Sequence, residues 1–147
     1  MSGLKINKNR VWLCFPPLVL CVLDLAATLW GQSASYWYGE YLYISEGNPI
    51  AYFLLAIHPS LYIIGTAAWI AAFSFLMLRL PRRLALTLCF FISFAHLWGT
   101  LGWIMQCSVL STCGQYSHNT GYLVSVVLTL GASTLLVAAV EKSATHN

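Results

Sequence analysis

Long apolar segments separated by short polar breaks make up most of the sequence. Three of these segments are long enough to cross about 30 Å of hydrocarbon as a helix. They are residues 11–31, 84–105 and 121–140. A fourth apolar stretch, 49–80, is too long for one upright crossing, and His58-Pro59 interrupts it. Because the residue before a proline avoids the helical conformation and proline favours the first helical turn, we expect this span over 59–80.

A short helix is expected just before that span, over 48–57. Asn48 is a favoured N-cap residue, and Pro49 suits the first helical position. The pattern predicts an all-α protein: an integral membrane four-helix bundle with one extra short helix, interfacial or re-entrant, on the outer side. Residues 1–147 form a single polytopic membrane domain in this interpretation, because a chain of this length suffices for one domain at most.

The composition is typical of a membrane protein. Hydrophobic residues make up 59% of the 147 residues and charged residues only 7%, whereas soluble domains carry about 25% charged residues. The mean hydropathy is +0.74. These values exclude a soluble cytosolic enzyme, a disordered chain and a nucleic-acid-binding protein, and they make the lipid bilayer the first partner. The length of the first span and the presence of Asp24 within it favour a retained helix over a cleaved signal peptide.

The placement of the seven Lys and Arg residues predicts the orientation. They fall before the first span, in the break between the second and third spans, and after the last span. They are Lys5, Lys8, Arg10, Arg79, Arg82, Arg83 and Lys142. Cytoplasmic segments carry an excess of Lys and Arg, so both termini and the 79–83 break are expected on the cytoplasmic side. We therefore expect a multi-pass protein of the inner (plasma) membrane.

The first outer loop is rich in aromatic side chains, with five rings within residues 35–43. Because Trp and Tyr gather at the level of the lipid headgroups, this loop is expected to lie on the membrane surface. The alternatives are a lid over a cavity that opens outward and a docking face for a partner.

Small residues recur at helical spacing in the spans, and they predict close helix packing. The third span has Ala95, Gly99 and Gly102 in this arrangement, and the second span has Gly65 followed by further small residues. Small side chains let helices approach closely in lipid. We therefore expect a compact bundle rather than a wide pore.

Polar residues inside or beside the spans are the candidates for a functional site. Asp24 is the only acid in the core of a span, and such carboxylates normally face the bundle interior with a partner. Thr28 follows on the same helical face, and His96 lies at a similar depth in the third span. Glu46 and Asn48 lie just outside, next to the short helix. The predicted polar cluster for a ligand or a partner is Asp24, Thr28, Glu46, Asn48 and His96.

Two kinds of chemistry fit this cluster. A set of two carboxylates and a histidine could hold a divalent metal or relay protons, and Asp24, Glu46 and His96 are the candidate ligands. The sequence has neither H-E-x-x-H spacing nor a metal-binding cysteine cluster. A structural role explains the same residues. His96 is then a hydrogen-bonded packing residue, and Asp24 is protonated and bonded to a neighbour. At the short helix, Asn48 is the cap and either Glu46 or Asp24 accepts hydrogen bonds.

The five cysteines divide into two groups. Cys14, Cys21 and Cys89 lie within spans and are interpreted as small apolar residues. Cys107 and Cys113 share the second outer loop and are the candidate disulfide pair on an oxidising outer side. The C-x-x-C spacing of thiol oxidoreductases is absent, which disfavours a redox role.

Two short motifs carry a family resemblance. Asp24 and Thr28 form an Asp-x-x-x-Thr motif in the first span, and Glu46-Gly47-Asn48-Pro49 forms a Glu-x-Asn-Pro motif before the short helix. With these motifs, residues 17–80 resemble an uncharacterised prokaryotic family of small multi-span membrane proteins. The family often has a Lys in the second span, which this chain lacks, and His96 is a looser match. The resemblance implies a fold and a polar cluster but no established reaction.

The function expected from the sequence is binding. The chain would act as an accessory subunit of a membrane complex, or as a binder of lipid or a small ligand, with a membrane-protein partner or a homodimer as the protein contact. The first alternative is an intramembrane enzyme, metal-dependent in one version, that uses Asp24, Glu46 and His96. The second alternative is a proton- or ion-coupled transporter in which Asp24 titrates.

Overall fold

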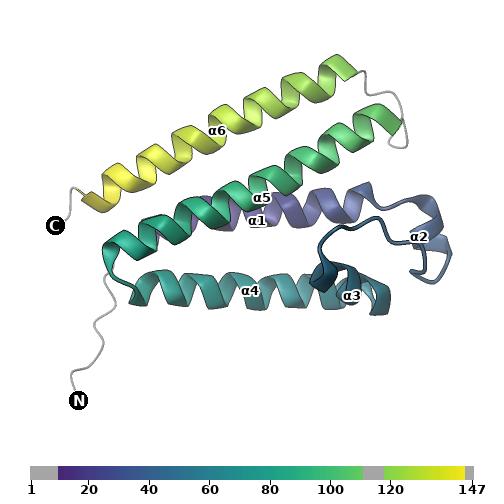
Figure 1. Ribbon diagram of the computed structural model, residues 1–147, viewed down its shortest axis with the longest axis horizontal. Coiled ribbons are helices and arrows are strands. Elements are labelled where there is room, and N and C mark those ends of the chain that lie inside the picture. The colour runs from purple at the N-terminus through teal and green to yellow at the C-terminus, as the bar shows by residue number, and fades with distance from the viewer. Residues whose placement is uncertain (1–9, 111–117, 145–147) are drawn as a thin grey trace.

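The computed structural model describes residues 10–110 and 118–144, and in this part of the chain every regular element is a helix. The elements are α1 (Val11–Gly31), α2 (Ala34–Tyr38), α3 (Pro49–Ile57), α4 (Pro59–Arg79), α5 (Arg82–Leu110) and α6 (His118–Ala144). The four long helices lie side by side, and the short helices α2 and α3 gather at one end of them (Figure 1). The expected all-α class is confirmed for the described residues.

Within the described residues, three helices are long and apolar enough to cross a membrane. They are α1, α4 and the Arg82–Gln106 part of α5. Much of their apolar surface is exposed, and α4 is the least covered of the three. Exposed apolar helix surface of this extent suits lipid rather than water, so the helices support a membrane protein. A fourth crossing, by α6, stays a prediction.

The apolar core lies where the start of α1 meets the end of α4 and the start of α5. Its buried residues are Leu13, Cys14, Phe73, Met77, Ala85, Cys89 and Ile92. Cys14, Cys21 and Cys89 are all buried and free, which agrees with their interpretation as small apolar residues. This end of the bundle is therefore closely packed, and α1 and α5 form its most extensive helix pair.

The described cations gather at the same end. The Arg10 guanidinium donates a hydrogen bond to the carbonyl of Leu80, which joins the start of α1 to the end of α4. The ammonium of Lys142, near the end of α6, lies 3.9 Å from the ring centroid of Trp12. The other described Lys and Arg residues lie at the α4–α5 junction. The described Lys and Arg residues, which are far apart in the sequence, thus lie together at one end of the bundle, which we call the basic end.

The loop between α1 and α3 contains a short helix, α2, that the sequence analysis did not predict. Its N-cap is Ser33, whose Oγ accepts a hydrogen bond from the backbone N–H of Tyr36. Tyr36 is fully buried, and its hydroxyl donates to the carbonyl of Leu55 at 3.1 Å. The side chain of Gln32 bonds both backbone groups of Ser45, at 3.0 and 3.1 Å. The loop is therefore fastened to α1 and α3 rather than simply resting on a lipid surface.

The predicted short helix and its cap are confirmed as α3. The Asn48 side chain accepts hydrogen bonds from the N–H groups of Ile50 and Ala51, at 2.9 and 3.4 Å, and Pro49 is the first helical residue. His58 is extended, so α3 ends and α4 starts in a new direction. A Cβ on Gly65 would come within 2.7 Å of Leu54, which shows that α3 folds back against α4.

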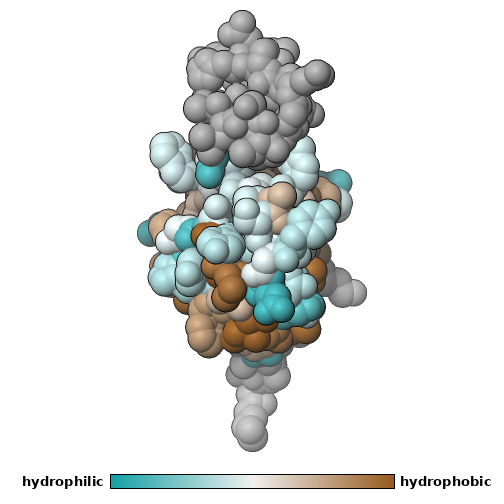
Figure 2. Space-filling model, turned by 90° about the vertical axis from the view of Figure 1, so that its right-hand side faces the viewer, coloured by the Kyte–Doolittle hydropathy of each residue, from teal (hydrophilic) through white to brown (hydrophobic). Residues whose placement is uncertain are grey.

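Figure 2 looks onto the end of the molecule that carries α2 and α3. Pale side chains of intermediate hydropathy mix there with hydrophilic ones, and apolar side chains gather below them. Tyr38 and Tyr43 are highly exposed on the loop, and Ile50 and Phe53 are highly exposed on α3. This mixture of aromatic and apolar side chains is typical of a surface at the level of lipid headgroups.

Candidate functional site

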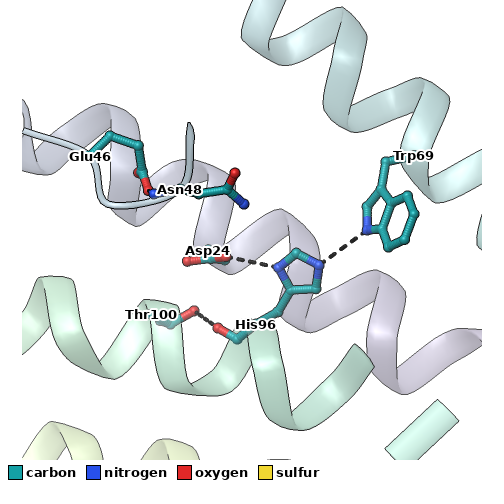
Figure 3. Close-up of polar contacts among 6 residues, drawn as sticks. All are labelled: Asp24, Glu46, Asn48, Trp69, His96 and Thr100. Atoms are coloured by element: carbon teal, nitrogen blue, oxygen red, sulfur yellow. Dashed lines mark hydrogen bonds and ion pairs between the residues drawn. The ribbon is translucent and has the colours of Figure 1, made fainter. Parts of the chain in front are cut away.

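A side-chain hydrogen bond joins α1 to α5. Asp24 Oδ2 lies 2.8 Å from His96 Nδ1, and the two side chains are only 18% and 21% exposed. Figure 3 shows Asp24, His96 and Trp69 pointing toward one another from α1, α5 and α4. The sequence predicts a similar depth for Asp24 and His96, and the structure places the two side chains in direct contact.

The hydrogen bond from Trp69 indicates which ring nitrogen of His96 carries the proton. Its indole Nε1–H donates a hydrogen bond to His96 Nε2 at 3.4 Å. Because an indole nitrogen can only donate, Nε2 must present a lone pair. The proton of the neutral imidazole is then on Nδ1, from which it is donated to Asp24. His96 is therefore a neutral bridge between the two side chains and does not cancel the charge of the Asp24 carboxylate.

The backbone of α5 makes room for this contact. A Cβ placed on Gly99 would come within 2.5 Å of Asp24 Oδ1, so only a glycine lets the carboxylate lie against α5 at this point. Thr100 turns its hydroxyl back to the carbonyl of His96 at 2.8 Å. The small residues of this span predicted a close approach of helices. At Gly99, this close approach leaves room for the Asp24 carboxylate between α1 and α5.

A cavity of about 480 Å³ opens beside the Asp24–His96 pair, bounded by α1, α3, α4 and α5. Three tryptophans line it, Trp69, Trp98 and Trp103, and Tyr62 lines it from α4. Sequence analysis missed these aromatic residues. The signal that could have found Tyr62 and Trp69 is a stripe at helical spacing on α4, with Gly65 and Thr66 between them.

All five residues of the predicted polar cluster line this cavity: Asp24, Thr28, Glu46, Asn48 and His96. Asp24, Thr28 and His96 come from the long helices, and Thr28 is 2% exposed. Glu46 and Asn48 come from the loop before α3. The structure therefore brings the whole set to one cavity. Within the set, Asp24 bonds His96 and Glu46 bonds the backbone of Asn48.

Glu46 takes part in the start of α3 as well as in the cavity. Its Oε1 accepts a hydrogen bond from the backbone N–H of Asn48 at 2.8 Å, as the structural interpretation of the motif expected. Partial burial raises the pKa of the Glu46 carboxyl above its ordinary value, the backbone N–H of Asn48 acts in the opposite direction, and the charge of Asp24 raises it again. The two acids therefore sense each other across the cavity.

A second hollow of about 410 Å³ adjoins the first at the loop end. Glu46, Gly99 and Trp103 line both spaces. Ser45 and Gln106 belong to the second space alone. Glu46 consequently lies where the cavity meets a more open vestibule on the side away from the basic end.

Two predictions from the sequence, a metal site and a disulfide, find no support among the described residues. Among the described residues, no group of three or more His, Cys, Asp and Glu side chains is arranged to hold a metal ion. A divalent metal on Asp24, Glu46 and His96 stays a prediction. The candidate disulfide partners, Cys113 and the side chain of Cys107, lie outside the described residues.

Comparison of the chain with protein-family models, with curated proteins and with solved structures gives no match. The resemblance to the small multi-span family therefore stays a prediction. The class that the fold itself supports is a helical protein with three helices, among the described residues, able to cross a membrane.

Proposed function

We propose that this protein is a small multi-pass membrane protein that binds a lipid or a small organic ligand in the cavity beside Asp24 and His96. The observation that carries the proposal is the cavity itself. Its volume of about 480 Å³ falls within the range of roughly 300–1,000 Å³ that is common for small-molecule sites. Aromatic walls with a few converging polar groups are also the usual composition of such sites.

The position of the cavity in the membrane follows from the basic end. We propose four spans, α1, α4, α5 and α6, in the inner membrane, with both termini on the cytoplasmic side. The described Lys and Arg residues lie at one end of the bundle, and an excess of these residues marks cytoplasmic segments. The cavity and its vestibule then belong to the outer half of the protein.

Binding fits the geometry better than catalysis by the Asp24–His96 pair does. In an acid–base role, a neutral histidine oriented by a carboxylate takes a proton with its second ring nitrogen. Here that nitrogen, Nε2 of His96, accepts the indole N–H of Trp69. The indole of Trp69 therefore occupies the histidine nitrogen to which a substrate would have to give its proton. The same bonds hold three helices around the cavity.

A space-filling substitution tests the proposal. Thr66 on α4 lines the cavity, whereas its neighbour Ala67 is exposed and does not line it. We expect Thr66→Phe to expel ligand that co-purifies with the detergent-solubilised protein, and Ala67→Phe to retain it. Native mass spectrometry reports the bound mass and its occupancy. Equal occupancy in Thr66→Phe, Ala67→Phe and the wild type would contradict a ligand in this cavity.

A further inference from the structure

The cavity is lined by two acids and by no Lys or Arg side chain of the described residues. The two acids are Asp24 and Glu46. The sequence has no Lys or Arg between Arg10 and Arg79, or between Arg83 and Lys142. Along α1, Asp24 is about 21 Å from Arg10 at the helical rise of 1.5 Å per residue. No ammonium or guanidinium group of the described bundle is therefore placed to neutralise these acids.

The histidine does not fill this role either. His96 donates through Nδ1 to Asp24 and accepts through Nε2 from Trp69, so the bonded imidazole is neutral. A carboxylate in the interior of a membrane protein is costly and normally has a partner that favours its charge. The bond from a neutral imidazole supports the carboxylate but leaves its negative charge in place.

The aromatic walls favour a cation that is organic. Cations are attracted to the faces of aromatic rings, most strongly to Trp, and this attraction is typical of sites for quaternary ammonium groups. Trp69, Trp98 and Trp103 all line the cavity, together with Tyr62. The cavity volume of about 480 Å³ is many times the roughly 30 Å³ that one water molecule occupies. A bare inorganic ion, which is about as small as a water molecule, would leave most of the cavity unfilled.

Such a cation has access from two sides. The vestibule reaches the cavity past Glu46 on the outer end. On the flank, Trp69 of α4 and Trp98 of α5 line the cavity while being 49% and 72% exposed, so they mark a mouth between these two helices. A cationic headgroup whose chain stays in lipid would use the flank, and a free cation would use the vestibule.

We propose that the ligand of this cavity is an organic cation, with a quaternary ammonium or amine group that Asp24 and Glu46 neutralise and the tryptophans enclose. This inference rests on the proposed binding function and names the chemical class of its ligand. The lipid headgroup and the free cation share this chemistry.

The test compares choline with its uncharged carbon isostere, which has the same shape without the charge. Purified protein in a neutral detergent is titrated with each, at constant ionic strength set by sodium chloride, and tryptophan fluorescence reports binding. We expect saturable binding of choline and none of the isostere. Dodecyltrimethylammonium, compared per mole fraction in the micelle, distinguishes the sources: a much stronger response than to choline assigns a membrane-borne headgroup, and a similar response assigns a free cation.

Charge-removing variants complete the test. We expect Asp24→Asn and Glu46→Gln each to weaken choline binding by about tenfold or more, since removal of one partner of a desolvated charge pair has effects of this size. Glu46→Gln keeps an oxygen for the Asn48 N–H, so it serves even where Asp24→Asn fails to fold. Glu40→Gln is the matched control, because Glu40 is an exposed acid of the same end that does not line the cavity.

The two proposals fail in different ways. If the isostere binds as well as choline, or sodium replaces choline, and Thr66→Phe abolishes binding, the organic-cation inference is overturned and the binding function stands. If no probe binds and the mass of co-purified ligand is unchanged in Thr66→Phe, both are overturned.

Discussion

Glu46 connects the backbone of its loop to the electrostatics of the cavity. Its carboxylate accepts the N–H of Asn48, yet burial raises its pKa above the ordinary value. An acid whose pKa is raised on folding makes the folded state bind more protons than the unfolded state between the two pKa values. Stability therefore falls as the pH rises through this window, and the ionised carboxylate opposes folding while no cation is bound.

We expect Glu46→Gln to melt at a higher temperature than the wild type at about pH 8, where the wild-type carboxylate is charged, and to lose this advantage at about pH 4. The amide oxygen still accepts the Asn48 N–H, so the comparison isolates the charge. Thermal unfolding in neutral detergent, without added organic cation, measures both values. Glu40→Gln, which removes an exposed acid that does not line the cavity, is the control variant. A Glu46→Gln melting temperature below the wild type at the higher pH would show that the carboxylate stabilises the fold.

The contact between Asp24 and His96 was predictable because both residues sit at equal depth in their spans, and an acid in a span needs a partner. Trp69 was not predictable in the same way. Whether its indole meets His96 depends on how α4 is rotated about its axis, and the sequence pattern of an almost uniformly apolar helix does not fix that rotation. The residue types that carry the site were therefore readable, but the bond that sets the histidine tautomer was not.

At the scale of helices, the pairing of α1 with α5 depends on the backbone of α5. Gly99 lies against Asp24, whereas a Cβ added to Gly102 would have no atom of the described structure within 4 Å. The two glycines belong to the same helix and are about one turn apart, so they share helix propensity and differ in packing. They form a matched pair for measuring what the close approach contributes.

We expect Gly99→Ala to destabilise the protein by about 1–3 kcal/mol, the usual cost of overpacking, because either Asp24 or α1 must move. Gly102→Ala should be neutral or stabilising by up to about 1 kcal/mol, since alanine favours the helix. Thermal and denaturant unfolding of both variants in the same detergent give the difference. Equal stability of the two variants would contradict the close contact between α1 and α5 at Gly99.

The elements themselves were predictable to different degrees. The capped helix α3 followed from Asn48 and Pro49, because capping chemistry is local. The helix α2 was missed, since five residues are too few for a periodic signal and its position depends on the remote bond from Tyr36 to Leu55. The helix α5 extends beyond the expected 84–105 at both ends, to Arg82 and Leu110, because an apolar run marks only the part suited to lipid.

At the scale of the whole molecule, the two ends of the bundle have opposite character. The basic end has the closely packed apolar core around Leu13 and Phe73. The other end has the cavity, the fastened loop, and the acids Glu40 and Glu46. A cation that approaches the end opposite the basic one would thus meet acids and aromatic rings first.

The basic end of the bundle leads to a test that distinguishes a topology with three membrane crossings from one with four. With the start of α1 in the cytoplasm, three crossings would place the end of α6 outside, and four would return it to the cytoplasm. The contact between Lys142 and Trp12 places the end of α6 beside the start of α1, which favours four. We expect green fluorescent protein fused after Asn147 to fluoresce, and alkaline phosphatase fused there to be inactive, in bacterial cells. Fusions after Gly47, on the outer loop, should give the reverse. An active phosphatase at the C-terminus would place α6 outside the membrane core and require the basic end to be divided between two sides, which the positive-inside preference opposes.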